Sequence, residues 1–138
     1  MAESPAQVRK ENKQSMQVLE QLMKKLSVSK PGDDAKGASQ EIASFINGDI
    51  EEHEAPTKVV DGLTKMLNNK KDAAARQNAC EAIAAIAKHA DVAPIVQPYL
   101  VHLLPAVLNA VGDKMAPVKV SAQDAAISIV KAVNANSV

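Results

Sequence analysis

Two glycines separated by four residues raise the question of a phosphate-binding loop. The segment Gly32–Gly37 reads GDDAKG. Such a loop follows a strand and continues with Lys and then Ser or Thr, because the ammonium group holds the outer phosphates and the hydroxyl binds magnesium. Here Ala38 and Ser39 follow, and no strand pattern precedes the segment. We therefore interpret it as a flexible linker between helices and predict no nucleotide binding.

Histidine and carboxylate residues come together in the sequence EEHE, where His53 lies among glutamates at residues 51–54. Metal ligands must converge on one point, and neighbours in one loop rarely do so alone, so a solvated acidic turn is the better interpretation. His89 and His102 have no second ligand at helical spacing. Spacing alone does not order the serine, histidine and aspartate residues into a catalytic triad. We predict no catalytic, cofactor-binding or metal-binding residues in this chain.

Basic residues recur at equivalent places along the chain. A shift of 44 residues carries Lys114 onto Lys70, and both lie in predicted turns. The candidates for contacts with an anionic partner are Lys70, Lys71, Arg76, Lys114 and Lys119. They form either a solvated rim, with Lys119 bonded to Asp113 or to a neighbouring turn, or a ridge that contacts phosphate groups. The sequence leaves both interpretations open.

The composition of the 138-residue chain restricts the fold class. Hydrophobic residues make up 46% of the sequence but aromatic residues only 1%, and strands favour aromatic and β-branched side chains. An all-β fold is therefore disfavoured. Sixteen basic residues balance sixteen acidic ones, which argues against nucleic-acid binding through bulk charge but not against a local basic edge.

Cellular location is predicted from three further features. The lone Cys80 lies within an apolar helical pattern and is interpreted as a buried thiol in a reducing compartment. The N-terminal residues lack the apolar core of a secretory signal. No apolar run approaches the roughly 20 residues of a membrane span. We expect a cytoplasmic protein that does not bind membranes.

Helical periodicity begins after a polar, aperiodic segment, residues 1–13, which we interpret as a flexible tail. The remaining residues, 14–138, divide at Pro, Gly and Asn-rich breaks into three helix pairs, at about 14–47, 56–90 and 95–134. A shift of 44 residues carries Ile127 onto Ile83 and Val130 onto Ile86, and the preceding pair repeats at a shift of 41.

Helix hairpins that repeat every 40–47 residues are typical of HEAT and armadillo arrays. We therefore predict an all-α HEAT-repeat solenoid, a right-handed stack of three antiparallel hairpins. Alanines such as those in ACEAIAAIA (79–87) would let the second helices approach their neighbours closely. The residues expected in the core include Leu22, Phe45, Leu63, Ile83, Ile86, Val107, Ile127 and Val130.

The final helix is apolar around much of its circumference, although the terminal repeat of a complete solenoid has a polar outer face. We therefore predict that residues 115–138 form a surface on which a further hairpin stacks. In that case the chain is a segment of a longer array.

Three stretches resemble one family: ASFINGDIEEHEAP (43–56), QPYLVHLLPAVLNAVGDK (97–114) and ISIVKAVNANSV (127–138). They are similar to the N-terminal HEAT region of fungal translation elongation factor 3, and the likeness covers most of residues 14–138. The resemblance implies a ribosome-associated ATPase of the ABC class. Its HEAT region would dock on ribosomal RNA and ribosomal proteins, and its cassettes would hydrolyse ATP to help release exit-site tRNA.

This sequence contains neither cassette, so the chain itself is not expected to be an enzyme. ATP and magnesium are expected only in cassettes outside it. The predicted partners are the ribosome, downstream HEAT repeats and those cassettes. The alternative function is a generic HEAT scaffold for another protein, such as a ribosome-associated translation regulator with similar repeats.

Overall fold

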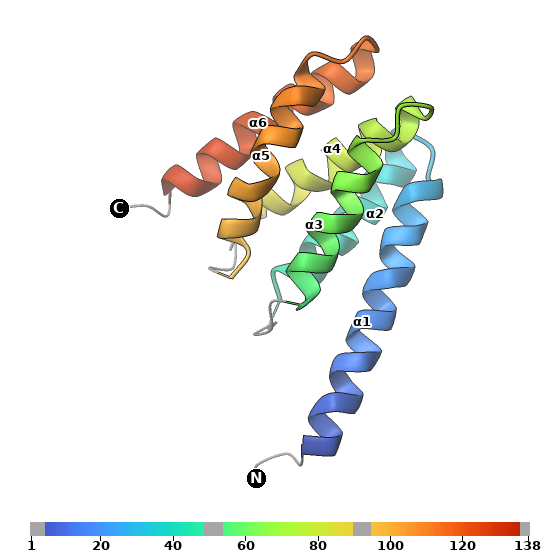
Figure 1. Cartoon of the computed structure of the whole chain (residues 1–138), viewed down its shortest axis with the longest axis vertical. Helices are drawn as coiled ribbons and strands as arrows, with labels where there is room; N and C mark the ends of the chain where they lie inside the picture. The colour runs from blue at the N-terminus through green and yellow to red at the C-terminus, as the bar shows by residue number, and fades with distance from the viewer. Residues whose placement is uncertain (1–4, 49–53, 90–94, 136–138) are drawn as a thin grey trace.

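The computed structural model describes residues 5–48, 54–89 and 95–135. Within these ranges the chain forms helices joined by turns, and no strand is present there. The helices are α1 (Pro5–Val28), α2 (Asp33–Ile46), α3 (Glu54–Leu67), α4 (Ala73–Lys88), α5 (Gln97–Val111) and α6 (Ala116–Ala135) (Figure 1). The predicted all-α fold is confirmed.

Local sequence explains where two of the helices begin. Gly32 separates α1 from α2 with φ of 112°, a left-handed conformation that glycine adopts without steric cost. The Gly32–Gly37 segment is therefore a turn followed by the start of α2, not a flexible linker along its whole length. Asp72 caps α4, because its Oδ1 accepts a hydrogen bond from the Ala75 N–H at 3.1 Å.

Helix α1 begins earlier than the sequence predicted. It starts at Pro5, so residues 5–13 are helical rather than an irregular tail. Proline suits the first turn of a helix, and most of the residues that follow are good helix formers. Figure 1 shows this part of α1 extending away from the other helices. The sequence pattern did not predict this part of α1 because the segment has no apolar face, which a helix outside the packed body does not need.

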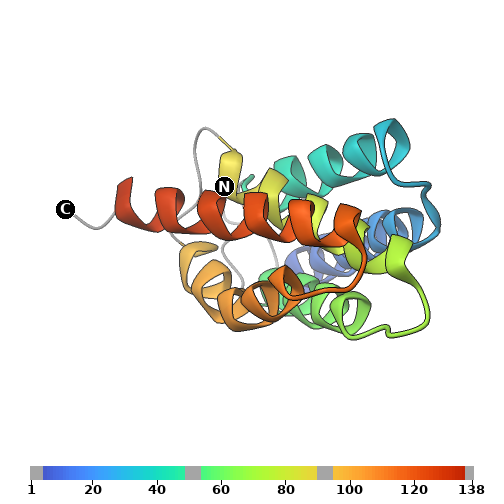
Figure 2. The same ribbon diagram turned by 90° about the horizontal axis from the view of Figure 1, so that it is seen from above.

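The helices form two layers. The first helices of the hairpins, α1, α3 and α5, make one layer, and the second helices, α2, α4 and α6, make the other (Figures 1 and 2). Within the second layer α4 packs against both α2 and α6, and each hairpin also packs its own two helices together. This is the predicted stack of three hairpins, with α4 at its centre.

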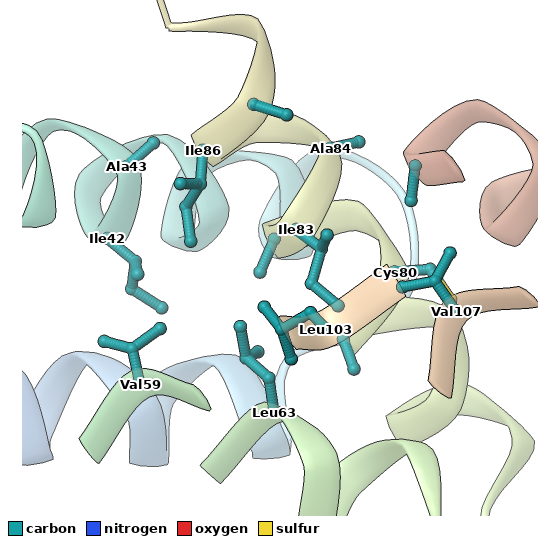
Figure 3. Packing of buried hydrophobic residues seen from close by; sticks show 14 of the residues in the cluster. Ile42, Ala43, Val59, Leu63, Cys80, Ile83, Ala84, Ile86, Leu103 and Val107 are labelled. Carbon is teal, nitrogen blue, oxygen red and sulfur yellow. The ribbon is translucent and has the colours of Figure 1, made fainter. Parts of the chain in front are cut away.

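Alanine provides much of the contact surface around α4. Ala79, Ala82, Ala84 and Ala87 are all buried beside Ile83, which is fully inaccessible to solvent. Figure 3 shows Ile83 and Ile86 among side chains from α2, α3 and α5. Small side chains let the helix axes lie close together, and the isoleucines fill the space between layers. The predicted role of the alanines is confirmed.

Some of the expected core residues are buried, and others are exposed. Leu63, Ile83, Ile86 and Val107 are buried, and Leu22 and Phe45 are partly buried against the core. Ile127 and Val130, however, are 55% and 46% exposed. The prediction that these two side chains lie in the core was wrong.

The reason is a difference of one residue in loop length. Five residues, 68–72, join α3 to α4, whereas four residues, 112–115, join α5 to α6. A shift of 44 residues therefore relates α3 to α5, but the shift between α4 and α6 is 43. One residue turns a helix by about 100°. Accordingly Ile129, and not Val130, is the buried counterpart of Ile86, and Val130 lies with Ile127 on the exposed face of α6.

Candidate functional site

The turns within the second and third hairpins lie at the same end of the stack (Figure 1). We call residues 68–72 and 112–115, together with Arg76 and Lys119 in the first turns of α4 and α6, the turn edge. All five predicted contact residues belong to this surface. It is built by helix ends, so the positions of its side chains follow from how the hairpins stack.

Arg76 connects the two turns. Its Nε donates to Asp113 Oδ2 at 2.7 Å and its Nη2 donates to Asp113 Oδ1 at 3.2 Å. Its Nη1 donates to the backbone carbonyls of Asn69 at 2.8 Å and Lys70 at 3.2 Å. The side chains of Arg76 and Asp113 are only 13% and 11% exposed. A two-pronged, largely buried pair of this kind fixes geometry better than a surface ion pair does.

Asp113 also accepts a hydrogen bond at Oδ1 from the Met115 N–H, at 2.9 Å. The hydrogen bond from Arg76, and next the one from Met115, lower the pKa of Asp113 below its ordinary value. The folded protein therefore favours the charged carboxylate. The stability that this contributes is present above the ordinary aspartate pKa and is lost as the pH falls through the lowered value.

A hollow of about 510 Å³ lies between the two turns, and Lys70, Arg76, Asp113 and Lys114 are among the residues that line it. Lys70, Lys71, Lys114 and Lys119 are all exposed. The structure thus brings Lys70 and Lys114 to one hollow, although they come from different hairpins. Lys71 and Lys119 lie on the turn edge but are not among the lining residues.

The pairing of Asp113 differs from the one considered from the sequence. Its partner is Arg76 of the preceding hairpin, not Lys119 of its own hairpin. With the shift of 43 residues, Lys119 is the counterpart of Arg76. Both residues donate their backbone N–H to the residue before the helix, Asp72 or Met115, which supports this equivalence. The types and spacing of these residues do not signal the pairing, because it depends on how successive hairpins stack.

The structure adds little support for the other candidate sites. His53 lies outside the described residues. Within residues 5–48, 54–89 and 95–135, no group of three or more His, Cys, Asp or Glu side chains is arranged to hold a metal ion. A second hollow, of about 370 Å³, lies between α2 and α4 and is lined by Lys36, Glu81 and His89 among others.

Stacked helix hairpins in two layers, alanine-rich second helices and an ion pair between successive turns define a HEAT-repeat solenoid. The family model described as "EF3 N-terminal HEAT repeat" matches residues 35–138. The chain belongs to this family, the N-terminal HEAT repeats of elongation factor 3. The family resemblance predicted from three sequence stretches is confirmed.

Individual relatives support the same assignment. Elongation factor 3A of Saccharomyces cerevisiae is 41% identical over 124 residues, which cover 90% of this chain and 12% of the relative. Elongation factor 3 of Eremothecium gossypii is 42% identical over 121 residues, covering 88% of this chain and 11% of the relative. Elongation factor 3 of Candida albicans is 34% identical over 128 residues, covering 93% of this chain and 12% of the relative.

The chain therefore spans only a small part of the length of these relatives, 12% in the first case. The family model describes the matched region as a HEAT repeat, which is not a catalytic domain. Among the helices that the structure describes, none is long and apolar enough to cross a membrane.

Proposed function

We propose that this chain is a ribosome-binding HEAT-repeat segment of a translation elongation factor. ATP-binding cassettes outside this chain would bind ATP and magnesium and drive release of tRNA from the exit site. Family membership and the names of the relatives support the class of factor. The observation that supports an RNA contact is the convergence of Lys70 and Lys114 on one hollow of the turn edge.

The turn edge is suited to ribosomal RNA because its exposed charges are mainly ammonium groups. The lysine ammonium is a compact charge that binds phosphate without a fixed orientation. Arg76 adds little free charge, since Asp113 neutralises it. The chain has a formal net charge of zero, so attraction to RNA would be local to this edge and strongly weakened by salt.

The other proposed partners are downstream HEAT repeats and the cassettes of the same polypeptide. The exposed apolar side chains of α6, such as Ile127 and Val130, support a further hairpin at that end. The proposed location is the cytoplasm, where such a factor would meet ribosomes. The alternative function, a scaffold for another protein, is favoured by the same exposed side chains, because a protein partner would bury them.

Charge reversal at the turn edge tests the proposal. The triple substitution Lys70→Glu, Lys71→Glu and Lys114→Glu should lower co-sedimentation with fungal ribosomes by more than about tenfold at low salt, because these lysines neutralise phosphate charge and the glutamates would repel it. The salt dependence of binding should decrease as well. Circular dichroism should show unchanged helix content, since all three side chains are exposed.

A matched control reverses the same number of charges at the other end of the helices. Lys58, Lys88 and Lys131 lie near the helix ends opposite the turn edge. Lys58 and Lys88 make exposed ion pairs with Glu20 and Asp124, which contribute little to stability. This control should retain binding. Equal loss in both variants, or no loss in the turn-edge variant, would contradict a ribosomal contact at the turn edge.

A further inference from the structure

Three basic residues in different environments line the hollow at the turn edge. Lys70 and Lys114 are exposed, whereas Arg76 is largely buried and paired with Asp113. The three basic residues would be counted together as positive charges in the sequence. Their environments separate them into groups with different roles.

The guanidinium of Arg76 has little capacity left for a ligand. It has five N–H donors, and hydrogen bonds to Asp113, Asn69 and Lys70 occupy most of them. Its charge is matched by the Asp113 carboxylate. An anion that entered the hollow would therefore meet the lysine ammonium groups and a neutralised pair.

The same network fixes the backbone beside both lysines. Arg76 donates a hydrogen bond to the carbonyl oxygen of Lys70 itself. On the other turn, Asp113 accepts a hydrogen bond from the N–H of Met115, next to Lys114. Because Arg76 and Asp113 are bonded to each other, the two turns are held at one separation. A site whose groups are positioned before binding loses less entropy when the ligand arrives.

We propose that Arg76 is a positioning residue, and that Lys70 and Lys114 together bind one phosphate of an RNA backbone in the hollow between the turns. The proposal rests on the proposed function, ribosome binding through the turn edge, and divides its residues by role. Lys70 and Lys114 contact the phosphate. Arg76 and Asp113 set the distance between the turns that carry them.

A set of three variants tests this division: Arg76→Gln, Asp113→Asn and the double substitution. Binding of the 138-residue chain to purified fungal ribosomes is measured over a series of salt concentrations. If Arg76 positions the lysines, each variant should bind about two- to tenfold more weakly, the cost of ordering the freed side chains. The effects should not add, because both substitutions break the same connection.

The salt dependence distinguishes a positioning role from a contact. It should stay unchanged in the Arg76→Gln variant, since no phosphate contact is lost. The double variant has the same net charge as the original chain, so its weaker binding cannot arise from long-range attraction. Circular dichroism confirms that each variant is folded, and the double variant keeps two amide groups that can still hydrogen-bond.

Three results would overturn the inference while leaving the proposed function in place. The first is a slope of log binding constant against log salt concentration that is shallower in Arg76→Gln by about 0.7–0.9, the value for one phosphate contact. The second is tighter binding by Asp113→Asn, which frees the guanidinium, and the third is unchanged binding by all three variants. Failure of the original chain to bind ribosomes, or full binding by the Lys70, Lys71 and Lys114 variant, would instead overturn the proposed function and this inference with it.

Discussion

Helices α4 and α6 have similar compositions but different neighbours. Helix α4 packs against α2 on one side and α6 on the other, whereas α6 packs against α4 and α5. Cys80, Ala84 and Ala87 of α4 are buried. With the shift of 43 residues, their counterparts in α6 are Gln123, Ile127 and Val130, and all of these are exposed.

Helix α2 shows which neighbour makes the difference. It packs against α1 of its own hairpin and α4 of the following one, and its buried side chains include Ser39, Ala43 and Ile46. Helices α2 and α4 are therefore each covered by a following hairpin, whereas no described hairpin follows α6. The comparison shows that burial in this fold is a property of the stack and not of one helix.

Thiol chemistry should show the largest difference between the two helices. Burial, and next the negative charges of Asp113 and Glu81, raise the pKa of the Cys80 thiol to about 12. At pH 8 almost no thiolate is present, whereas an exposed thiol with a pKa of about 8.5 is partly ionised. A cysteine placed by Gln123→Cys in a Cys80→Ala background should therefore be alkylated about a thousandfold faster than Cys80.

Alkylation with iodoacetamide at pH 8 and low denaturant measures both rates. Because the Cys80 pKa is raised, its rate should increase with pH well beyond the range in which an ordinary thiol reaches its maximum. Denatured samples of the two proteins should react at equal rates. Similar rates in the folded proteins would mean that α4 and α6 do not differ in coverage.

Truncation of isoleucine should give the next largest difference between α4 and α6. Ile83→Ala removes a fully buried side chain and should lower the free energy of unfolding by about 2–5 kcal/mol. Ile127→Ala, at 55% exposure, should change it by less than about 0.5 kcal/mol. Equilibrium unfolding in urea measures both values. Equal losses would support the 44-residue register, in which Ile127 is the buried counterpart of Ile83.

Hydrogen exchange should show a smaller difference in protection. The amides of α6 should exchange at least about tenfold faster than those of α4, because local opening is easier where one face lacks a packed neighbour. Protection of α6 should increase in a longer chain that includes the proposed downstream hairpins. Equal and high protection of both helices in a monomeric 138-residue chain would contradict a missing neighbour at α6.

Helix capping should give the smallest effect. Asp72 precedes α4 and hydrogen-bonds the Ala75 N–H, so Asp72→Ala should lower the free energy of unfolding by about 1 kcal/mol. Met115 occupies the equivalent position before α6, and its thioether is a poor acceptor. Met115→Ser should raise the stability by up to about 1 kcal/mol. Thermal unfolding measures both changes, and a destabilising Met115→Ser would contradict the equivalence of the two positions.

Much of the architecture could be predicted because helix periodicity, turn residues and repeat length are local properties of the chain. The three hairpins, the alanine-rich packing of α4 and the positions of Lys70 and Lys114 in turns all follow from such patterns. The family could be inferred from stretches that include inter-repeat segments. The helical start of α1 at Pro5 was missed, since that part of α1 has no apolar pattern.

What the sequence determined by itself was therefore the set of helices and their pairing into repeats. The tertiary structure decided which face of α6 is covered and which charge Arg76 meets. A single residue of loop length turns α6 by about 100°, and this places Ile129 in the core and Ile127 outside it. The Arg76–Asp113 pair joins residues 37 positions apart, because stacking brings successive turns together, and no local pattern in the chain records that distance.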